Sequence, residues 1–265
     1  MSRTAIIAGQ GALVETLVAA LDSPLVYALE GFEPAVPAQP FRIERLVPFL
    51  DQLINADVDK VIFVGAIRRP RLEPEAFDPR TAQLVPRILT AMQSGDDAAL
   101  REVLDIFEEY DLKVCGVDEI LPDLVPQSGV LTGDPSEADR RDAAQGAAIL
   151  AGTGQFDIGQ GVVVAQGLCL ALETLPGTAA MLEFAGRHRE LRPNPDGAKG
   201  VFFKAPKPTQ DRRIDLPTIG PDTVAQAAAA GLAGIAWQAG GVIVLDRDRT
   251  VSAATEAGLF LWARD

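Results

Sequence analysis

The apolar runs of this sequence are short, and they alternate with segments that carry apolar residues at helical spacing. The runs are 4–8 (TAIIA), 25–29 (LVYAL), 60–65 (KVIFVG) and 112–117 (LKVCGV), and the helix-like segments between them are 12–21, 43–55, 79–93 and 96–109. Apolar strands that alternate with helices are typical of a parallel sheet covered on both faces. The first half therefore predicts a small Rossmann-like α/β unit.

The second half predicts a separate domain. The stretch 122–135 is rich in proline and glycine and has no clean period, as expected of a connection between domains. We place the domains at 1–130 and 131–265. After a helix capped by Ser136, the pattern is mixed α/β, with strands at 161–166, 168–174, 200–204, 234–238, 242–246 and 259–263 and helices at 136–151, 177–186 and 218–231.

The charge balance excludes some partners. The 265 residues include 24 Lys and Arg against 37 Asp and Glu, a formal net charge of -13. Binding to nucleic acid by bulk electrostatics is not expected, because it needs clustered cations. No signal peptide or apolar run of about 18 residues is visible, so we expect a cytoplasmic protein. Cys115 and Cys169 lie in apolar runs and predict buried, reduced thiols, whereas the lone His188 predicts an exposed helix end.

Gly9-Gln10-Gly11 is the first candidate site. It follows a strand and opens a helix, where free backbone N–H groups favour an anion. The dinucleotide fingerprint is incomplete, since Val14 stands where a third glycine would be. The alternative is a tight turn with no ligand. An NAD-dependent or nucleotide-sugar oxidoreductase of Rossmann type is a rival function that this motif disfavours.

The segment 199–223 is the second candidate. It gathers scarce positive charge among carboxylates, at Lys199, Lys204, Lys207, Arg212, Arg213, Asp211, Asp215 and Asp222. Basic groups of this kind suit a phosphate or diphosphate, and interleaved carboxylates suit Mg²⁺. The alternative is a solvated loop whose charges pair with one another.

The third candidate surrounds strand ends in the second half. It comprises Gly159-Gln160-Gly161, Gln166-Gly167, Glu173 and Pro176-Gly177-Thr178. Strand ends are where α/β sheets bind ligands. Two interpretations of Glu173 remain open. It is either a ligand or base of a functional site, or a charged residue at the edge of a strand.

Five stretches together resemble one family, the UDP-2,3-diacylglucosamine pyrophosphatases of the LpxI type. They are IIAGQGALV, VVVAQGLCLALETLPGTAAML, GVFFKAPKP, KPTQDRRIDLPTIGPDTV and AAAAGLAGIAWQAG, and they span nearly the whole chain in the expected order. The resemblance implies metal-dependent hydrolysis of UDP-2,3-diacylglucosamine to UMP and 2,3-diacylglucosamine 1-phosphate (lipid X) in lipid A biosynthesis. It also implies a lipid substrate held between the two domains.

The resemblance assigns roles to individual residues. It implies Asp211, Asp215 and Glu173 as metal ligands, with Asp211, Asp215, Asp222 and position 225 as the catalytic set. It implies substrate contacts at Gly9, Gln10, Gly11, Gln166, Thr178, Lys204, Lys207 and Gln210. The chain departs from the family pattern at Ala179, where an acidic residue is expected after Gly-Thr, and at Ala225, where one is expected after Thr-Val. An alanine at position 225 is either natural or an introduced substitution that removes a catalytic carboxylate. If it is introduced, we expect the chain to bind substrate without turning it over.

The same resemblance implies a cofactor and partners. The cofactor is Mg²⁺ or another divalent cation such as Mn²⁺. The partners are UDP-2,3-diacylglucosamine or lipid X, a transient contact with the inner-membrane surface, and a second copy of the chain in a homodimer. A non-catalytic protein that binds a lipid or a nucleotide is the remaining alternative.

Overall fold

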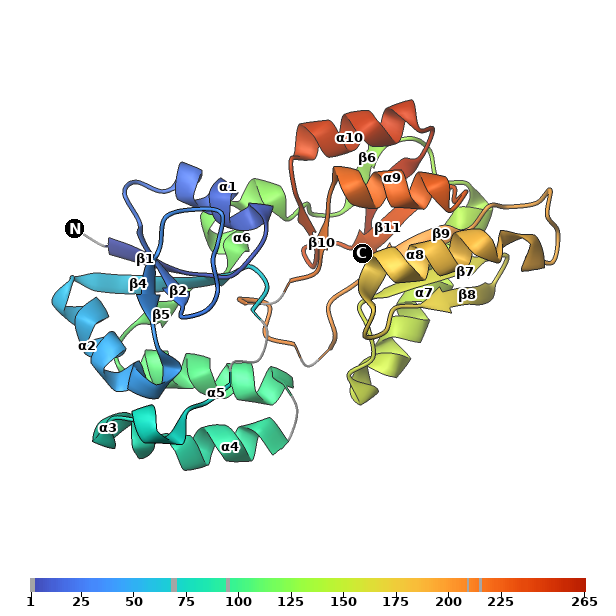
Figure 1. Ribbon diagram of the computed structural model, residues 1–265. Helices are drawn as coiled ribbons and strands as arrows, with labels where there is room; N and C mark the ends of the chain where they lie inside the picture. Colours follow the sequence, from blue (N-terminus) through green and yellow to red (C-terminus); the bar gives the residue numbers. More distant parts are fainter. Residues whose placement is uncertain (1–2, 68–70, 94–95, 209, 215) are drawn as a thin grey trace. The chain divides into compact units, whose positions relative to one another are not determined.

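The structure is a computed structural model that describes residues 3–67, 71–93, 96–208, 210–214 and 216–265. The chain forms two compact units, Met1–Leu121 and Pro122–Asp265 (Figure 1). The division comes earlier than the boundary placed after residue 130. The reason is that β6 (Gly129–Thr132) pairs with β13 (Phe260–Arg264), the last strand of the second unit.

The first unit is built on a sheet of five parallel strands in the order β3-β2-β1-β4-β5. The bounds are β1 (Arg3–Ala8), β2 (Leu25–Leu29), β3 (Gln39–Phe41), β4 (Val58–Val64) and β5 (Lys113–Val114). The predicted parallel sheet is confirmed. β3 was not predicted, because Gln39–Phe41 is a short edge strand without an apolar run.

Helices cover both faces of this sheet, with α1 on one face and α2 and α5 on the other (Figure 1). The bounds are α1 (Ala12–Ala20), α2 (Leu46–Asn55), α3 (Pro79–Ala82), α4 (Val85–Gln93), α5 (Asp96–Glu109) and α6 (Val117–Ile120), with 3-10 turns at Ile43–Arg45 and Pro74–Ala76. The single helix expected over 79–93 is two helices. Pro86 has no N–H to bond the carbonyl of Ala82, so the helical ladder breaks there.

The second unit holds a six-stranded mixed sheet in the order β6-β13-β11-β9-β7-β8. β9 (Val201–Lys204), β11 (Gly234–Gln238) and β13 are parallel, whereas β7 (Gly161–Ala165) runs antiparallel to both β9 and β8 (Leu168–Leu172). A small parallel pair, β10 (Thr218–Ile219) and β12 (Ile243–Val244), lies beside it. The predicted mixed α/β character is confirmed.

Alternating side chains of the strands pack against helices on opposite faces of this sheet. Phe202 joins the core formed with α8 (Gly177–Arg187), α9 (Pro221–Ala229) and α10 (Arg247–Glu256). Its neighbour Phe203 joins a second core beneath α7 (Glu137–Thr153). Figure 1 shows α8, α9 and α10 together on one side of the sheet. Further 3-10 turns are Pro122–Leu124, Gly154–Phe156 and Arg189–Leu191.

Three local predictions need correction. Cys115 is buried, but Cys169 is exposed, because β8 is an edge strand. The helix expected from 218 begins at Pro221, since Thr218–Ile219 pairs with β12 instead. α10 was not predicted, because its residues are mostly polar. Across the described ranges, no helix is both long and apolar enough to span a membrane.

A buried carboxylate ties α7 to the β7–β8 hairpin. The two turn residues, Gln166 and Gly167, both have positive φ, as tight hairpin turns require. Asp142, only 2% exposed, accepts hydrogen bonds from the backbone N–H groups of Gln166 (2.9 Å) and Gly167 (2.7 Å). A charged acceptor of two backbone donors stabilises this turn more than a neutral one would.

We predict that Asp142→Ala destabilises the second unit. Losing two charge-assisted hydrogen bonds and leaving two amides without their acceptor corresponds to about 2–4 kcal/mol. Urea unfolding followed by tryptophan fluorescence measures this, because both tryptophans, Trp237 and Trp262, belong to this unit. Arg141→Ala, at the exposed neighbouring position, is the control. Equal stability of the two variants would refute the assignment.

Candidate active site

Most of the predicted residues of the second unit lie at the carboxyl edge of its sheet. β8 and β9 end at this edge, and the antiparallel β7 begins there, so that Gly161 pairs with Lys204. α8, α9 and α10 each precede one of the parallel strands and therefore begin at the same edge. Helix N-termini carry partial positive charge, and strand carboxyl ends are the usual ligand site of α/β sheets.

Lys204 is the last residue of β9 and lies buried at this edge, in a position that we call the floor of the site. The residue is 6% exposed, and its Nζ donates a hydrogen bond to Thr178 Oγ1 at 2.7 Å. Thr178, in the first turn of α8, donates in turn to Glu173 Oε1 at 2.8 Å. Glu173 Oε2 lies 4.0 Å from Lys204 Nζ. The structure thus brings together predicted residues from two motifs, since Glu173 and Thr178 belong to VVVAQGLCLALETLPGTAAML and Lys204 belongs to GVFFKAPKP.

Burial governs the ionisation of Lys204. Removal from water disfavours the ammonium and lowers the pKa of Lys204 below its usual value. The facing Glu173 carboxylate acts in the opposite direction and raises that pKa. Glu173 is therefore the counter-charge of a buried lysine.

The glycines of Gly159-Gln160-Gly161 are explained by Glu173. A Cβ at Gly159 would lie 2.1 Å from the carbonyl oxygen of Glu173, and a Cβ at Gly161 would lie 2.5 Å from Glu173 Oε2. Neither position has room for a side chain. This motif, read from sequence as a possible ligand loop, makes space for a carboxylate of the protein itself.

The loop after β9 is held by side-chain amides. Gln210 Oε1 accepts hydrogen bonds from Gln160 Nε2 (2.6 Å) and from the backbone N–H of Lys207 (3.0 Å). Lys207 Nζ forms an ion pair with Asp157. Sequence reasoning missed roles for Gln160 and Asp157. Gln160 lay within a noted motif, whereas nothing near Asp157 signalled its pairing with Lys207, fifty positions away along the chain.

Asp211 is already engaged by a cation. Its carboxylate accepts hydrogen bonds from Arg213 Nε (3.0 Å) and Nη2 (2.7 Å). Asp215, the other acid predicted in this loop, lies outside the described residues. Within the described ranges, no three His, Cys, Asp or Glu side chains gather as a protein-only metal site would require. Mg²⁺ typically uses one or two carboxylates with ligand phosphates and water. Asp211 is the acid of this pair that the structure describes, and its carboxylate is bound by Arg213.

Asp222 and Ala225 lie on α9, whose N-terminal end is at the same edge. Both are exposed, and Asp222 is in the first turn. Gly220 precedes the helix, and its N–H donates to Thr223 Oγ1 at 3.2 Å. An acidic residue in this turn is favoured by the helix dipole. Among the described residues, no side-chain contact assigns a role to Ala225.

Gln166 and Lys199 lie at the opposite edge of the sheet. Gln166 follows the last residue of β7, and Lys199 precedes β9. The side-chain amide of Gln166 donates hydrogen bonds to the carbonyls of Asn194 and Ala198 and accepts one from the N–H of Asn194. These bonds hold the loop before β9 in place. A substrate contact by Gln166 stays a prediction. His188 is the C-cap of α8, which confirms its predicted place at a helix end, but it is half-buried and not exposed as predicted.

In the first unit, Gly9-Gln10-Gly11 connects β1 to α1. Gln10 and Ala66 exchange two backbone hydrogen bonds, of 3.0 and 2.8 Å, which join this turn to the end of β4. A Cβ at Gly9 would lie 2.6 Å from the carbonyl oxygen of Ala66. Gly9 is therefore required by a close backbone approach. Gly11 precedes α1 with φ of 124° and has open space around its Cβ position.

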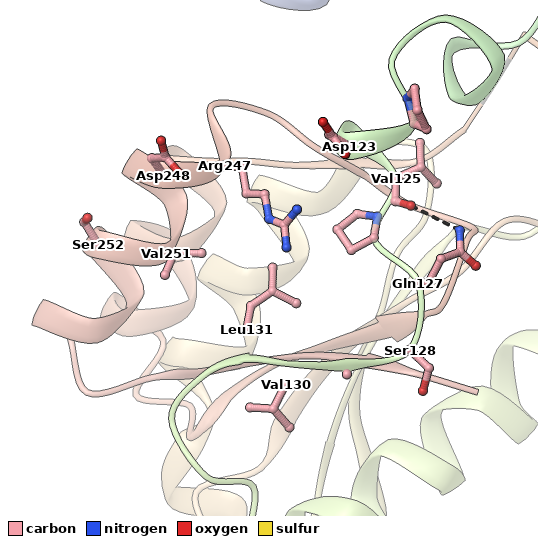
Figure 2. A pocket seen from close by; sticks show the side chains of 13 residues that line it. Asp123, Val125, Gln127, Ser128, Val130, Leu131, Arg247, Asp248, Val251 and Ser252 are labelled. Carbon is pink, nitrogen blue, oxygen red and sulfur yellow. Dashed lines mark hydrogen bonds between the residues drawn. The ribbon is translucent and has the colours of Figure 1, made fainter.

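Each unit also has a cavity. In the second unit, a cavity of about 1090 Å³ lies between residues 122–131 and α10, with Arg247 projecting into it (Figure 2). It contains none of the predicted site residues. In the first unit, an apolar cavity of about 260 Å³ lies between the sheet and α4 and α5, with a lining that includes Ile7, Phe41, Phe63, Met92, Ala99 and Phe107.

The fold is that of a two-unit α/β protein, and most of the polar candidate residues of the second unit lie at the carboxyl ends of its parallel strands. Family models for the LpxI N-terminal domain and the LpxI C-terminal domain match residues 3–124 and 127–262. The chain is 35% identical over 275 positions to a curated protein of Caulobacter vibrioides named UDP-2,3-diacylglucosamine pyrophosphatase LpxI. That match covers 100% of this chain and 98% of the relative. The chain belongs to the LpxI family.

We predict that Gly9→Ala destabilises the first unit by about 1–3 kcal/mol, because the added methyl group forces the β1 and β4 ends apart. Thermal unfolding followed by circular dichroism measures the change. Gly152→Ala is the matched control, since no atom lies within 4 Å of its Cβ position in α7. That variant should be neutral or more stable by up to about 1 kcal/mol. Similar stabilities for both variants would contradict the close approach.

Proposed function

We propose that the chain hydrolyses the diphosphate bond of UDP-2,3-diacylglucosamine to give UMP and lipid X in lipid A biosynthesis. The observation that carries this proposal is the full-length match to a relative named for that activity. As a member of the LpxI family, the chain is a hydrolase that acts on a diphosphate bond.

The carboxyl edge of the second unit supplies groups suited to a diphosphate. Lys204 offers a buried ammonium, and the first turn of α8 beside it adds the partial positive charge of a helix N-terminus. Cationic groups fixed in a dry site stabilise the charge that develops on phosphate oxygens. Gln160 and Gln210 hold the loop that carries Lys207.

We further propose that Mg²⁺, or another divalent cation such as Mn²⁺, is bound by Asp211 and Asp215 together with the substrate phosphates. These carboxylates would hold the cation, whose chemistry there would be to polarise phosphoryl oxygens and lower the pKa of bound water. Asp222, exposed in the first turn of α9, is the carboxylate proposed to orient the attacking water. Arg213 keeps Asp211 in place through its two hydrogen bonds.

The first unit is proposed to be Rossmann-like and to contribute substrate contacts at Gly9, Gln10 and Gly11. The order β3-β2-β1-β4-β5 reverses direction at β1, and the crevice beside β1 and β4 is the usual ligand position in such sheets. The incomplete glycine fingerprint, with Val14 at the third position, argues against the alternative of an NAD-dependent oxidoreductase.

The apolar cavity of the first unit is proposed to accept part of an acyl chain. Its walls are almost wholly aliphatic and aromatic, and several come from the carboxyl ends of strands, such as Leu29 and Phe41. Burying an acyl chain there is favoured by about 0.8 kcal/mol per methylene group.

Contact with the inner-membrane surface is a separate proposal. Leu175 is fully exposed and Phe156 is largely exposed, and both belong to loops at the carboxyl edge of the second unit. Exposed apolar side chains of this kind can enter the headgroup region of a membrane. A homodimer and a cytoplasmic location stay predictions.

The function is tested by incubating the chain with UDP-2,3-diacylglucosamine and Mg²⁺ and measuring UMP. UMP release that EDTA abolishes, and that Asp211→Asn lowers at least about 100-fold, supports the proposal. If no UMP forms, Ala225→Asp distinguishes the two remaining interpretations, an inactive enzyme variant and a binding protein without activity. A gain of hydrolysis on restoring the carboxylate identifies an inactive variant of the enzyme, and no gain favours a protein that only binds.

The acyl site is tested by filling the cavity. Ala99→Phe places a ring among its lining residues, so the KM for the diacylated substrate should rise about 10- to 100-fold as methylene groups are displaced. Ala98→Phe, at the adjacent position of α5 outside that lining, is the matched control. Equal KM values for the two variants would place the acyl chains elsewhere.

A further inference from the structure

The buried ammonium of Lys204 has few partners for its charge. An ammonium has three N–H donors. In the described part of the chain, Nζ donates a hydrogen bond to Thr178 Oγ1 and lies 4.0 Å from Glu173 Oε2. It also lies over the ring of Phe202, 5.8 Å from the ring centroid. Buried charges are stable only when paired and hydrogen-bonded. The position of this group therefore depends on Thr178 and Glu173.

The direction of the hydrogen bonds in this cluster is fixed. Lys204 Nζ can only donate, so the Thr178 hydroxyl accepts from it. The hydroxyl has one hydrogen, and it points to Glu173 Oε1. Thr178 is thus a bridge, oriented at one end by the carboxylate and at the other by the ammonium.

The surroundings of Glu173 do not suit a metal ligand. Oε1 already accepts from Thr178, and Oε2 is buried without a hydrogen-bond donor among the described residues. Oε2 faces the backbone of Gly161, beside the side chains of Phe202 and Met181. Mg²⁺ demands octahedral coordination and retains several waters, which this apolar wall does not admit. A cation on Oε2 would also lie within about 6 Å of Lys204 Nζ, given a metal–oxygen distance of about 2.1 Å.

We propose that Glu173 and Thr178 are positioning residues that hold the Lys204 ammonium at the floor of the site to bind a diphosphate, and that Glu173 is not a metal ligand. The identification of the anion as a diphosphate rests on the proposed function. This replaces the role for Glu173 that the family resemblance implies.

The first test measures the affinity for inorganic pyrophosphate by calorimetry in the presence of EDTA. Thr178→Val keeps the side-chain shape and both neighbouring charges but removes the bridge, so we expect affinity to fall about tenfold, with most of it restored in Thr178→Ser. Lys204→Met should abolish binding. No pyrophosphate binding by the unchanged chain, or equal affinities for the valine and serine variants, would overturn the proposal.

The second test measures Mn²⁺ binding by electron paramagnetic resonance in the presence of pyrophosphate. Glu173→Gln should bind Mn²⁺ within about twofold of the unchanged chain. Loss of a ligand would weaken binding by at least about 10- to 100-fold, the effect of changing a residue that only hydrogen-bonds to a ligand. A tenfold or greater loss overturns the proposal. If the unchanged chain itself does not bind Mn²⁺, Glu173 holds no metal and the first test decides the positioning role.

Neither test requires turnover, so failure of the proposed function can be distinguished from failure of the positioning role. That failure appears as absence of UMP while pyrophosphate binding and its dependence on Thr178 persist. Where UMP is released, the kcat of Glu173→Gln should fall about tenfold or more, and the Mg²⁺ concentration for half-maximal activity should stay within about twofold. A raised Mg²⁺ requirement would contradict the positioning role.

Discussion

The antiparallel pairing of β7 with β9 is the interaction on which the candidate site depends. It sets Gly161 opposite Lys204, so the start of one strand and the end of another share an edge. The following hairpin turns the chain back, and β8 delivers Glu173 to the same edge, where its N–H bonds the carbonyl of Gly161. A parallel β7 would have put Gly159-Gln160-Gly161 at the far end of the sheet. One reversal of strand direction therefore assembles the residues around Lys204.

Glycines shape both units through the same steric effect. In the first unit, Gly9 and Gly65 let the ends of β1 and β4 approach so closely that a Cβ on either would meet the backbone of the other segment. In the second unit, Gly159 and Gly161 leave room for Glu173. Neither arrangement requires a ligand. The glycine motifs at strand ends therefore mark places where two segments of the chain are in close contact. A substrate is proposed to bind at the same strand ends.

The basic side chains of segment 199–213 are close in sequence but have different environments in the structure. Lys199 lies at the opposite edge of the sheet, Lys207 pairs with Asp157, and Arg213 pairs with Asp211. Lys204 differs from these, because it is buried and meets its carboxylate at 4.0 Å. A strongly acidic chain thus keeps a cation away from solvent at a strand end, where an anion gains more from it than at an exposed surface.

The sequence by itself determined the local elements and the family. Apolar periodicity located most strands and helices, Ser136 capped α7 as expected, and five motifs indicated the LpxI family. These signals are local, since propensity, capping and motif spacing act over a few residues. The edge strand β3 and the polar helix α10 were missed because their stability comes from packing. Only the tertiary structure decided that Glu173 faces Lys204, because strand direction and pairing join residues distant in sequence.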